Sequence, residues 1–310
     1  QQLIADGTVR IAVIPARGAL GRVDSFLVRL NCQPGTQVEV AEELAAHESV
    51  RFLTLVTGEY DIIAEIVVQG GAAHYPQLIQ RLQSIEAISR WRSDLIMHVY
   101  KVGHDWSRQL LTGGIDAPPD AASAVDIPLS PWDVDADTCE PGHFDEADWR
   151  ILAELRDDAR ASFQSVGERT GMNESSVRRG FDRMRSRDCI NVITLVSAGA
   201  LGMGAETLLI VRVAPSRLQA VAGALVQYPA FRYVAAILDD NSLFCEVITT
   251  SVSALNDFIS GTLAHLEGVQ GWTGAMELLY LKRGFVETPW WRAQLEATPP
   301  IGDAATISGP

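Results

Sequence analysis

Long apolar segments are absent from this chain of 310 residues, and that absence already limits its class. No stretch of about 18 or more consecutive apolar residues occurs, so we expect no transmembrane helix. Residues 1–7 contain no basic segment followed by an apolar one, so they do not form a signal peptide. They also lack an initiator methionine, and we expect the chain to begin inside a longer natural protein. The sequence therefore predicts a cytoplasmic protein that does not bind a membrane.

Cysteine and histidine are scarce and scattered. The four cysteines, Cys32, Cys139, Cys189 and Cys245, include no Cys-x-x-Cys pair and have no histidine at the spacing of a metal site. The six histidines are equally dispersed. We therefore expect reduced structural thiols, no zinc or other metal site, and no cofactor.

A net charge of −14 at pH 7 by itself argues against nucleic acid as a partner. The distribution of the charge matters more than its sum. Residues 112–149 hold ten acidic residues and no lysine or arginine, whereas five arginines lie within residues 178–187. The acidic excess therefore lies mainly outside one strongly basic segment, and DNA stays a candidate partner.

The chain repeats its own motifs in the same order at a nearly constant spacing. The Gly-Ala-Leu-Gly turn at residues 18–21 returns at residues 199–202, which is 181 positions later. Trp91 returns as Trp272 at the same spacing. Apolar strands follow the two turns, at residues 26–30 and 209–213. These correspondences indicate two copies of one module.

Each copy shows the strand and helix order β-α-β-β-α-β, which predicts a ferredoxin-like α/β (α+β) domain. The expected strands and helices of copy one lie near residues 22–31, 36–47, 52–57, 61–68, 72–86 and 91–101. Those of copy two lie near residues 204–214, 216–227, 231–238, 242–250, 252–264 and 271–282. One sheet face packs on two helices, and the other is partly apolar. We therefore expect these domains to pair, with each other or with those of a second chain, in a homodimer at least.

Composition divides the chain further. Residues 112–142 are rich in proline, glycine, alanine and acids, which predicts a flexible tether, with an acidic arm that screens a basic DNA surface as the alternative. The predicted units are a remnant of a first DNA-binding domain with its hinge strand (1–21), a first effector domain (22–111), the linker (112–142), a helix-turn-helix domain with hinge (143–203), a second effector domain (204–296) and a disordered tail (297–310).

The pattern of residues 143–190 predicts three short helices. Acidic residues begin the first helix, Ser162 caps the second, and Gly171 ends it. Asn173 then caps a third helix, in which Val177, Phe181 and Met184 share one face. A glycine-containing turn before the last of three helices is typical of a helix-turn-helix.

The outward face of the third helix holds the candidate DNA contacts. A recognition helix presents its first outward residues to base edges, and arginine can contact guanine through two hydrogen bonds. The later arginines are better placed for phosphates. The candidates are Asn173, Ser175, Ser176, Arg178 and Arg179 near the helix start, and Arg183, Arg185 and Arg187 toward its end. A solvated charged helix is the alternative. Gly180 in mid-helix is unusual, and suggests a close approach of the backbone to DNA or to a neighbouring helix.

At this point the sequence resembles the Lrp/AsnC family of transcriptional regulators. The helix opening at 144–152, the turn Gly171-Met172-Asn173 and the strand 190–195 are similar to that family's winged helix-turn-helix and hinge. The resemblance implies double-stranded DNA and a small-molecule effector such as an amino acid as partners. It also implies that the effector domains have the ferredoxin-like fold.

The resemblance places an effector pocket at the turn that contains Thr57, Gly58, Tyr60 and Asp61. The Gly58 amide could receive a carboxylate, and Asp61 could pair with an ammonium group. A plain hairpin turn is the alternative. Copy two lacks this Gly-x-x-Asp pattern at residues 238–242, so we do not expect it to bind effector. Copy one begins at its hinge strand, with residues 1–5 as the end of a first recognition helix.

Two other functions are consistent with the same architecture. Siroheme decarboxylases resemble it and can be fused in tandem, but they rely on clustered His, Tyr and Arg after the hinge. The corresponding stretches here, 22–30 and 204–213, contain no His or Tyr, so we expect no enzyme and name no catalytic residue. An effector-binding assembly protein without DNA contact is the third candidate. A DNA-binding, effector-modulated regulator is the leading hypothesis.

Overall fold

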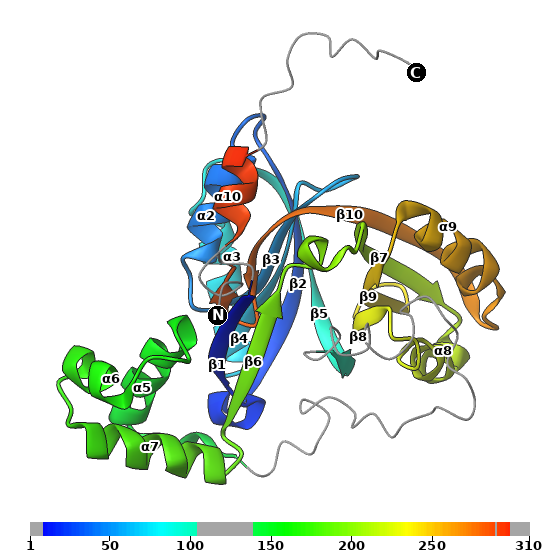
Figure 1. Ribbon diagram of the computed structural model, residues 1–310. Helices are drawn as coiled ribbons and strands as arrows, with labels where there is room; N and C mark the ends of the chain where they lie inside the picture. Colours follow the sequence, from blue (N-terminus) through cyan, green and yellow to red (C-terminus); the bar gives the residue numbers. More distant parts are fainter. Residues whose placement is uncertain (1–8, 104–138, 289, 298–310) are drawn as a thin grey trace.

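The computed structural model describes residues 9–103, 139–288 and 290–297 (Figure 1). The predicted helix end at 1–5, the linker up to residue 138 and the tail from residue 298 lie outside the described residues. Among the described helices, none is long and apolar enough to cross a membrane.

Both copies fold as the sequence predicts, in the order β-α-β-β-α-β. The first consists of β2 (Val23–Cys32), α2 (Gln37–Ala45), β3 (Val50–Val56), β4 (Ile62–Gln69), α3 (Pro76–Gln83) and β5 (Ile88–Val102). The second consists of β7 (Ala205–Val213), α8 (Leu218–Leu225), β8 (Phe231–Ile237), β9 (Ser242–Thr249), α9 (Val252–Gly261) and β10 (Val269–Arg283). Strands β8 and β9 are buried on both faces, because helices cover one face and the opposite module covers the other.

The two modules join into one closed sheet. With the short strand β11 (Val286–Glu287) at one end, its strand order is β11-β10-β3-β4-β2-β5-β8-β9-β7, and β10 also pairs with β7, which closes the ring. The long strands β5 and β10 make this possible, because each pairs first within its own module and then with the other, as Ile96 with Ile237 and Leu279 with Leu55. The expected pairing of the two α/β domains is therefore confirmed within a single chain, and among the described strands no open edge remains between them.

Buried lysines reveal the twofold relation of the modules. The ammonium group of Lys101 donates to the carbonyls of Val226 and Tyr228 at the end of α8. Lys282, 181 residues later, donates in the same way to Ala45 and His47 at the end of α2. Each module therefore supplies a lysine that satisfies the last carbonyl groups of a helix in the other module. Burial lowers the pKa of both lysines to about 8.

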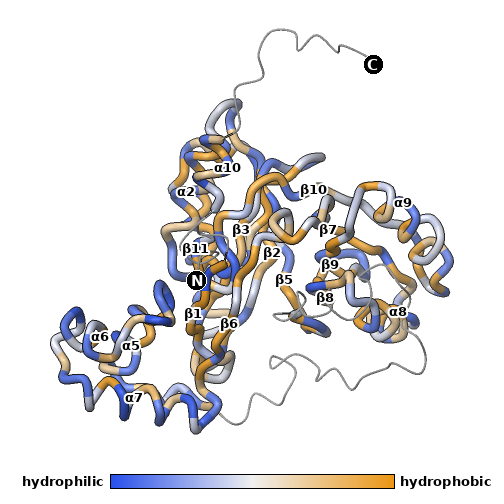
Figure 2. The backbone as a smooth tube through the Cα atoms, viewed as in Figure 1, coloured by the Kyte–Doolittle hydropathy of each residue, from blue (hydrophilic) through white to orange (hydrophobic). Residues whose placement is uncertain are grey.

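The closed sheet of the two modules forms a barrel, and the helix-turn-helix forms a separate lobe that a two-stranded ribbon joins to this barrel. The lobe consists of α5 (Glu146–Asp157), α6 (Phe163–Thr170) and α7 (Glu174–Ser186). The ribbon pairs β1 (Val9–Pro15) with β6 (Ile190–Val196) in antiparallel register. The hinge strands of the two copies thus lie side by side, and α10 (Trp290–Ala297) packs beside α2 on the barrel (Figure 1). In Figure 2 the strands of the barrel are largely hydrophobic and α7 is mostly hydrophilic.

Candidate DNA-binding helix and interdomain pocket

Helix α7 is defined at its start by the predicted cap. The side chain of Asn173 accepts a hydrogen bond from the Ser176 amide at 2.8 Å. The preceding turn depends on Gly171, which adopts φ +73°, and Ser162 caps α6 in the same manner as Asn173 caps α7. Val177 and Met184 are buried in the core of the lobe. The predicted caps at Ser162 and Asn173, the helix end at Gly171 and the buried face of α7 are therefore confirmed.

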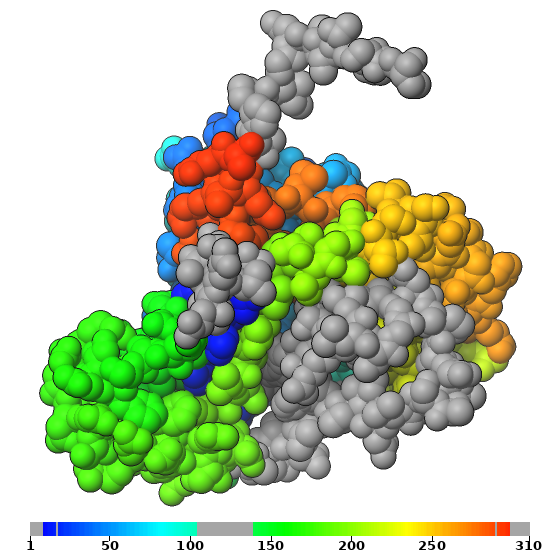
Figure 3. All heavy atoms as spheres, in the orientation of Figure 1, coloured from blue at the N-terminus to red at the C-terminus, as the bar shows by residue number. Residues whose placement is uncertain are grey.

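The outward side of α7 presents the candidate DNA residues at the surface. Arg178 and Arg179 are exposed, as are Ser175, Arg185 and Arg187. Arg178 forms an ion pair with Glu174 at 2.8 Å and lies over the Phe163 ring at 5.1 Å, while Arg179 donates to the Ser176 hydroxyl at 3.2 Å. Ser176 is half-buried. Figure 3 shows α7 along the outer edge of the lobe.

Arg183 differs from the other arginines of α7. Its guanidinium donates to the buried carboxylate of Asp148 at 2.5 Å and to Asp145 at 3.3 Å. Both acids begin α5, where each accepts an amide hydrogen bond from the other. These contacts raise the pKa of Arg183, mainly through the hydrogen bond to Asp148. Arg183 therefore joins α7 to α5, whereas the sequence predicts a phosphate contact for it.

Gly180 is explained by the same helix contact. It is buried, and a Cβ atom at this position would lie 2.8 Å from Ile151 Cδ1 and 3.2 Å from Asp148 Oδ1. Of the two explanations that the sequence left open, the approach to a neighbouring helix is confirmed.

We expect Gly180→Ala to lower the stability of the lobe by about 1–2 kcal/mol. The steric cost of overpacking exceeds the gain of up to about 1 kcal/mol in helix propensity. Thermal unfolding of the full chain, followed by circular dichroism, measures this change. Gly223→Ala in α8 is the matched control, because no atom of the described residues lies within 4 Å of a Cβ there. If Gly180→Ala stabilised the protein as the control does, the packing argument would be wrong.

The cysteines correct one prediction from the sequence. Cys139 and Cys189 form a disulfide, with their Cα atoms 5.1 Å apart, whereas Cys32 and Cys245 are buried free thiols. The expectation of four reduced thiols is therefore wrong. The sequence also gave no reason to connect His143 with a cysteine, yet its Nδ1 lies 3.5 Å from Cys189 Sγ. Chain folding brings together residues whose spacing is uninformative.

The predicted effector turn lies at the junction of the two modules. The amide of Thr57 donates to the Met276 carbonyl at 2.9 Å, and its hydroxyl accepts from the Met276 amide. The carboxylate of Asp61 accepts from the Cys32 amide at 2.8 Å. Gly58 has φ +101°, and Tyr60 is buried. The four residues are thus close together, but Thr57 and Asp61 already have protein partners.

The corresponding turn of copy two has a structural role. Asp239 accepts hydrogen bonds from Arg29 at 3.1 Å and from Arg92, both in the first module. The Leu238 amide donates to the Leu95 carbonyl at 2.8 Å. The turn that lacks the Gly-x-x-Asp pattern therefore fastens the two modules together.

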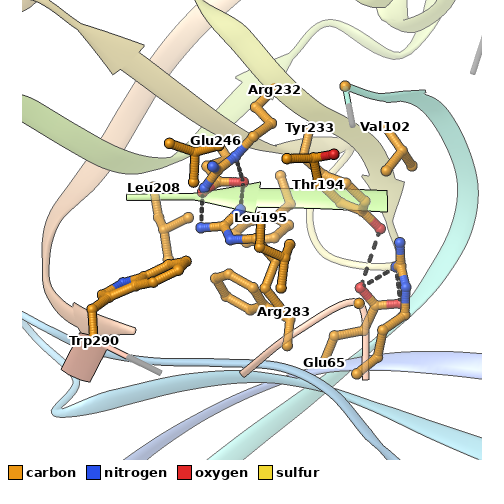
Figure 4. A pocket seen from close by; sticks show the side chains of 16 residues that line it. Glu65, Val102, Thr194, Leu195, Leu208, Arg232, Tyr233, Glu246, Arg283 and Trp290 are labelled. Carbon is orange, nitrogen blue, oxygen red and sulfur yellow. Dashed lines mark hydrogen bonds and ion pairs between the residues drawn. The ribbon is translucent and has the colours of Figure 1, made fainter. Parts of the chain in front are cut away.

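A pocket that opens to solvent lies between the modules. Its apolar wall includes Leu208, Phe244 and Trp290, and β6 contributes Thr194, Leu195 and Val196 (Figure 4). Sequence reasoning missed this site, because its residues come from both modules and from the hinge strand.

Ion pairs form the polar side of this pocket. Arg51 pairs with Glu65 at 2.6 Å (Figure 4). Glu246 pairs with both Arg232 and Arg283, and the distance to Arg283 is 2.7 Å. The two pairs Arg51–Glu65 and Arg232–Glu246 are related by the 181-residue repeat. Alternating positive and negative groups beside an apolar wall can bind a small zwitterion.

Glu206 makes the stability of this interface depend on pH. Burial raises its pKa to about 7, against the opposing effect of Arg232 and Arg283. The folded protein therefore holds a proton that the unfolded chain releases, and stability falls as the pH rises from about 4 through about 7.

We expect wild-type protein to lose roughly 1–3 kcal/mol between about pH 5 and pH 8, and Glu206→Gln to lose less. Urea unfolding at a series of pH values measures the difference. An exposed acid, Glu267→Gln, is the control, because its side chain is 79% exposed. Equal pH dependence in all three proteins would contradict the assignment.

Comparison with known proteins is consistent with this geometry. A model of the AsnC-type helix-turn-helix domain matches residues 144–185, and a model of the Lrp/AsnC ligand binding domain matches residues 25–105. The HTH-type transcriptional regulator FL11 of Pyrococcus furiosus is 27% identical over 149 residues, which are 48% of this chain and 97% of that protein. That relative thus corresponds to about half of this chain, as expected for a duplicated module.

Two further proteins show how far the similarity extends. The HTH-type transcriptional regulator Rv2324 of Mycobacterium tuberculosis is 37% identical over 81 residues, 24% of this chain and 55% of that protein. A crystal structure of the siroheme decarboxylase NirDL, in complex with an iron-uroporphyrin III analogue, aligns with a TM-score of 0.57. The alignment covers 96% of this chain and 86% of that one at 12% identity, so it shows a shared fold alone.

Proposed function

The chain belongs to the Lrp/AsnC family of transcriptional regulators, and we propose that it binds double-stranded DNA through α7 under the control of a small effector bound between its modules. One observation supports the control most directly. Helix α7 leads through Cys189 into β6, and β6 supplies a wall of the interdomain pocket. A ligand in the pocket would therefore touch the strand that carries the recognition helix.

DNA contact is proposed for the exposed residues of α7. Asn173, Ser175, Ser176, Arg178 and Arg179 would address base edges, and Arg185 and Arg187 would address phosphates. Arg183 would act through its bonds to α5, by holding the recognition helix in place. The cytoplasm, where the chromosome lies, is the proposed location.

We propose an apolar or aromatic amino acid as the effector. The pocket pairs guanidinium groups, which suit a carboxylate, with carboxylates, which suit an ammonium group. Its aromatic wall suits an apolar side chain. The turn with Thr57, Gly58, Tyr60 and Asp61 is the second candidate site, and variants can separate the two.

Calorimetry of the full chain with each of the common amino acids tests the effector site. We expect Thr194→Trp to reduce affinity at least about tenfold, because Thr194 is exposed and lines the pocket. Val192→Trp, two residues away on the same strand and 60% exposed, is the matched control. Asp61→Ala should leave binding unchanged. Loss of binding with Asp61→Ala but not with Thr194→Trp would place the site at the turn instead.

We propose that the chain is not an enzyme. The described residues that line the pocket include no histidine, and the arginines there already pair with glutamates. A tetrapyrrole with several carboxylates would have to separate several of those pairs, whereas an amino acid brings one carboxylate together with an ammonium group that can replace the lost partner. Titration with an iron porphyrin should therefore leave its absorption spectrum unchanged, and a saturable shift would support the decarboxylase alternative.

A further inference from the structure

The disulfide between Cys139 and Cys189 encloses the whole helix-turn-helix. Cys139 precedes the short helix η5 (Pro141–His143), which leads into α5. Cys189 follows α7 and precedes β6. The two cysteines are 50 positions apart in sequence, and all three helices of the lobe lie between them. One bond thus ties the entrance of the lobe to its exit.

Cys189 also fixes the end of the recognition helix. Its amide donates to the Met184 carbonyl in the last turn of α7 at 2.9 Å, and its carbonyl accepts from the Ala16 amide at 2.8 Å. Both cysteines are buried in the core of the lobe, in the same cluster as Val13. The link therefore joins α7, the entry segment and the β1–β6 ribbon at one point.

A histidine stands beside this link. His143 Nδ1 lies 3.5 Å from Cys189 Sγ and 3.3 Å from the Glu140 amide, which can donate to it. Accepting the amide hydrogen bond uses the Nδ1 lone pair, which places the ring proton on Nε2. When the disulfide is open, Nδ1 can exchange the Glu140 amide for the Cys189 thiol and accept the thiol proton. A thiolate is the form that attacks disulfides.

We propose that Cys139 and Cys189 are a reversible thiol–disulfide pair whose oxidised form holds α7 in its DNA-binding position. The effect of this pair on DNA binding rests on the proposed function. Its reversibility follows from the proposed location, because disulfides in the cytoplasm are typically reversible and redox-sensing. A low-molecular-weight disulfide is the oxidant. Cys189 thiolate attacks one of its sulfurs and releases one thiolate. Cys139 thiolate then attacks Cys189 Sγ and releases the second, so the protein loses two electrons and two protons.

The first test asks whether the link forms and opens in the folded full chain. The protein is treated with oxidised glutathione or with dithiothreitol, then denatured, alkylated and mapped by mass spectrometry. We expect a 139–189 cross-link after the first treatment, none after the second, and alkylated Cys32 and Cys245 in both. No cross-link after oxidation, or a cross-link that native protein keeps in dithiothreitol, would overturn the proposal.

Metal binding is the competing outcome, because the two sulfurs and His143 Nδ1 lie within 4.8 Å of one another. One tightly bound zinc ion per chain, with both thiols protected from glutathione, would overturn the proposal. His143→Gln tests the proton acceptor. We expect slower cross-linking by oxidised glutathione than in wild type, with the same final extent. An unchanged rate would overturn the assigned role of His143.

The second test measures the effect on α7. We expect hydrogen exchange of residues 184–190 to be faster in reduced than in oxidised protein, and affinity for a duplex obtained by in vitro selection to fall about threefold or more on reduction. Cys139→Ser should match reduced wild type under both conditions, and Cys32→Ala should respond as wild type does. Equal exchange in both states overturns the proposal. Redox-dependent exchange without any duplex binding supports the switch and contradicts the proposed function instead.

Discussion

Replacing Arg178 and Arg179 together by alanine is expected to lower the affinity for duplex DNA by roughly two orders of magnitude. Both side chains are exposed on α7, and each can contact a base edge or a phosphate. The fold should survive, because the Arg178–Glu174 pair is a surface pair between residues one helical turn apart, worth only about 0.3–0.5 kcal/mol. Fluorescence anisotropy with a labelled duplex at several salt concentrations measures the loss.

A second double variant controls for charge alone. Arg217→Ala with Arg292→Ala removes the same charge from exposed positions on the α/β modules, where the side chains are 46% and 56% exposed. This control should bind DNA nearly as tightly as wild type does. The salt dependence of the affinity for duplex DNA should decrease only in the variant that lacks Arg178 and Arg179. Equal losses in both variants would mean that net charge, and not the recognition helix, accounts for binding.

Glu65→Ala is expected to destabilise the protein by about 3–5 kcal/mol. The substitution removes both hydrogen bonds that the Arg51 guanidinium makes to this carboxylate, in a buried site between the modules. A buried charge that loses its partner costs more than the pair contributed. Urea unfolding, with the intrinsic tryptophan signal as the probe, measures the change in free energy.

The repeat supplies the matched comparison, since Glu246 occupies the same position 181 residues later. Glu246→Ala should cost less, because Glu206 and Glu277 stand near Arg232 and Arg283. Both carboxyl oxygens of Glu277 are shielded from solvent and lack a hydrogen-bond partner among the described residues. Burial raises the pKa of Glu277 well above its usual range, and the Glu246 charge raises it further. Removing Glu246 would therefore favour the ionised form of Glu277 beside Arg283 and Arg232. A larger loss for Glu246→Ala than for Glu65→Ala would contradict this explanation.

Local sequence rules predicted the elements of the fold well. Asn173 and Ser162 cap helices because their short polar side chains reach the amides three residues on. The alternation and clustering of β-branched residues predicted the strands of both modules, and the repeat predicted that the two modules share one fold. Each of these signals depends on residues that are near one another in the chain.

The remaining features depend on contacts between distant segments. The sequence predicted strands near residues 91–101 and 271–282, but not that β5 and β10 each cross from one module to the other. The same limitation applies to Arg183, which meets acids 35 and 38 residues earlier, and to the disulfide. The pocket could not be predicted, because its polar groups meet only when the barrel closes.

In vitro selection of duplexes from a random pool by the full chain is the most direct test of the central claim. A regulator that reads DNA through α7 should enrich one recurrent sequence, bind it more weakly as salt rises, and lose that preference when Arg178 and Arg179 are replaced by alanine. A pool that stays random after repeated selection at low salt would contradict the claim that this chain is a DNA-binding regulator.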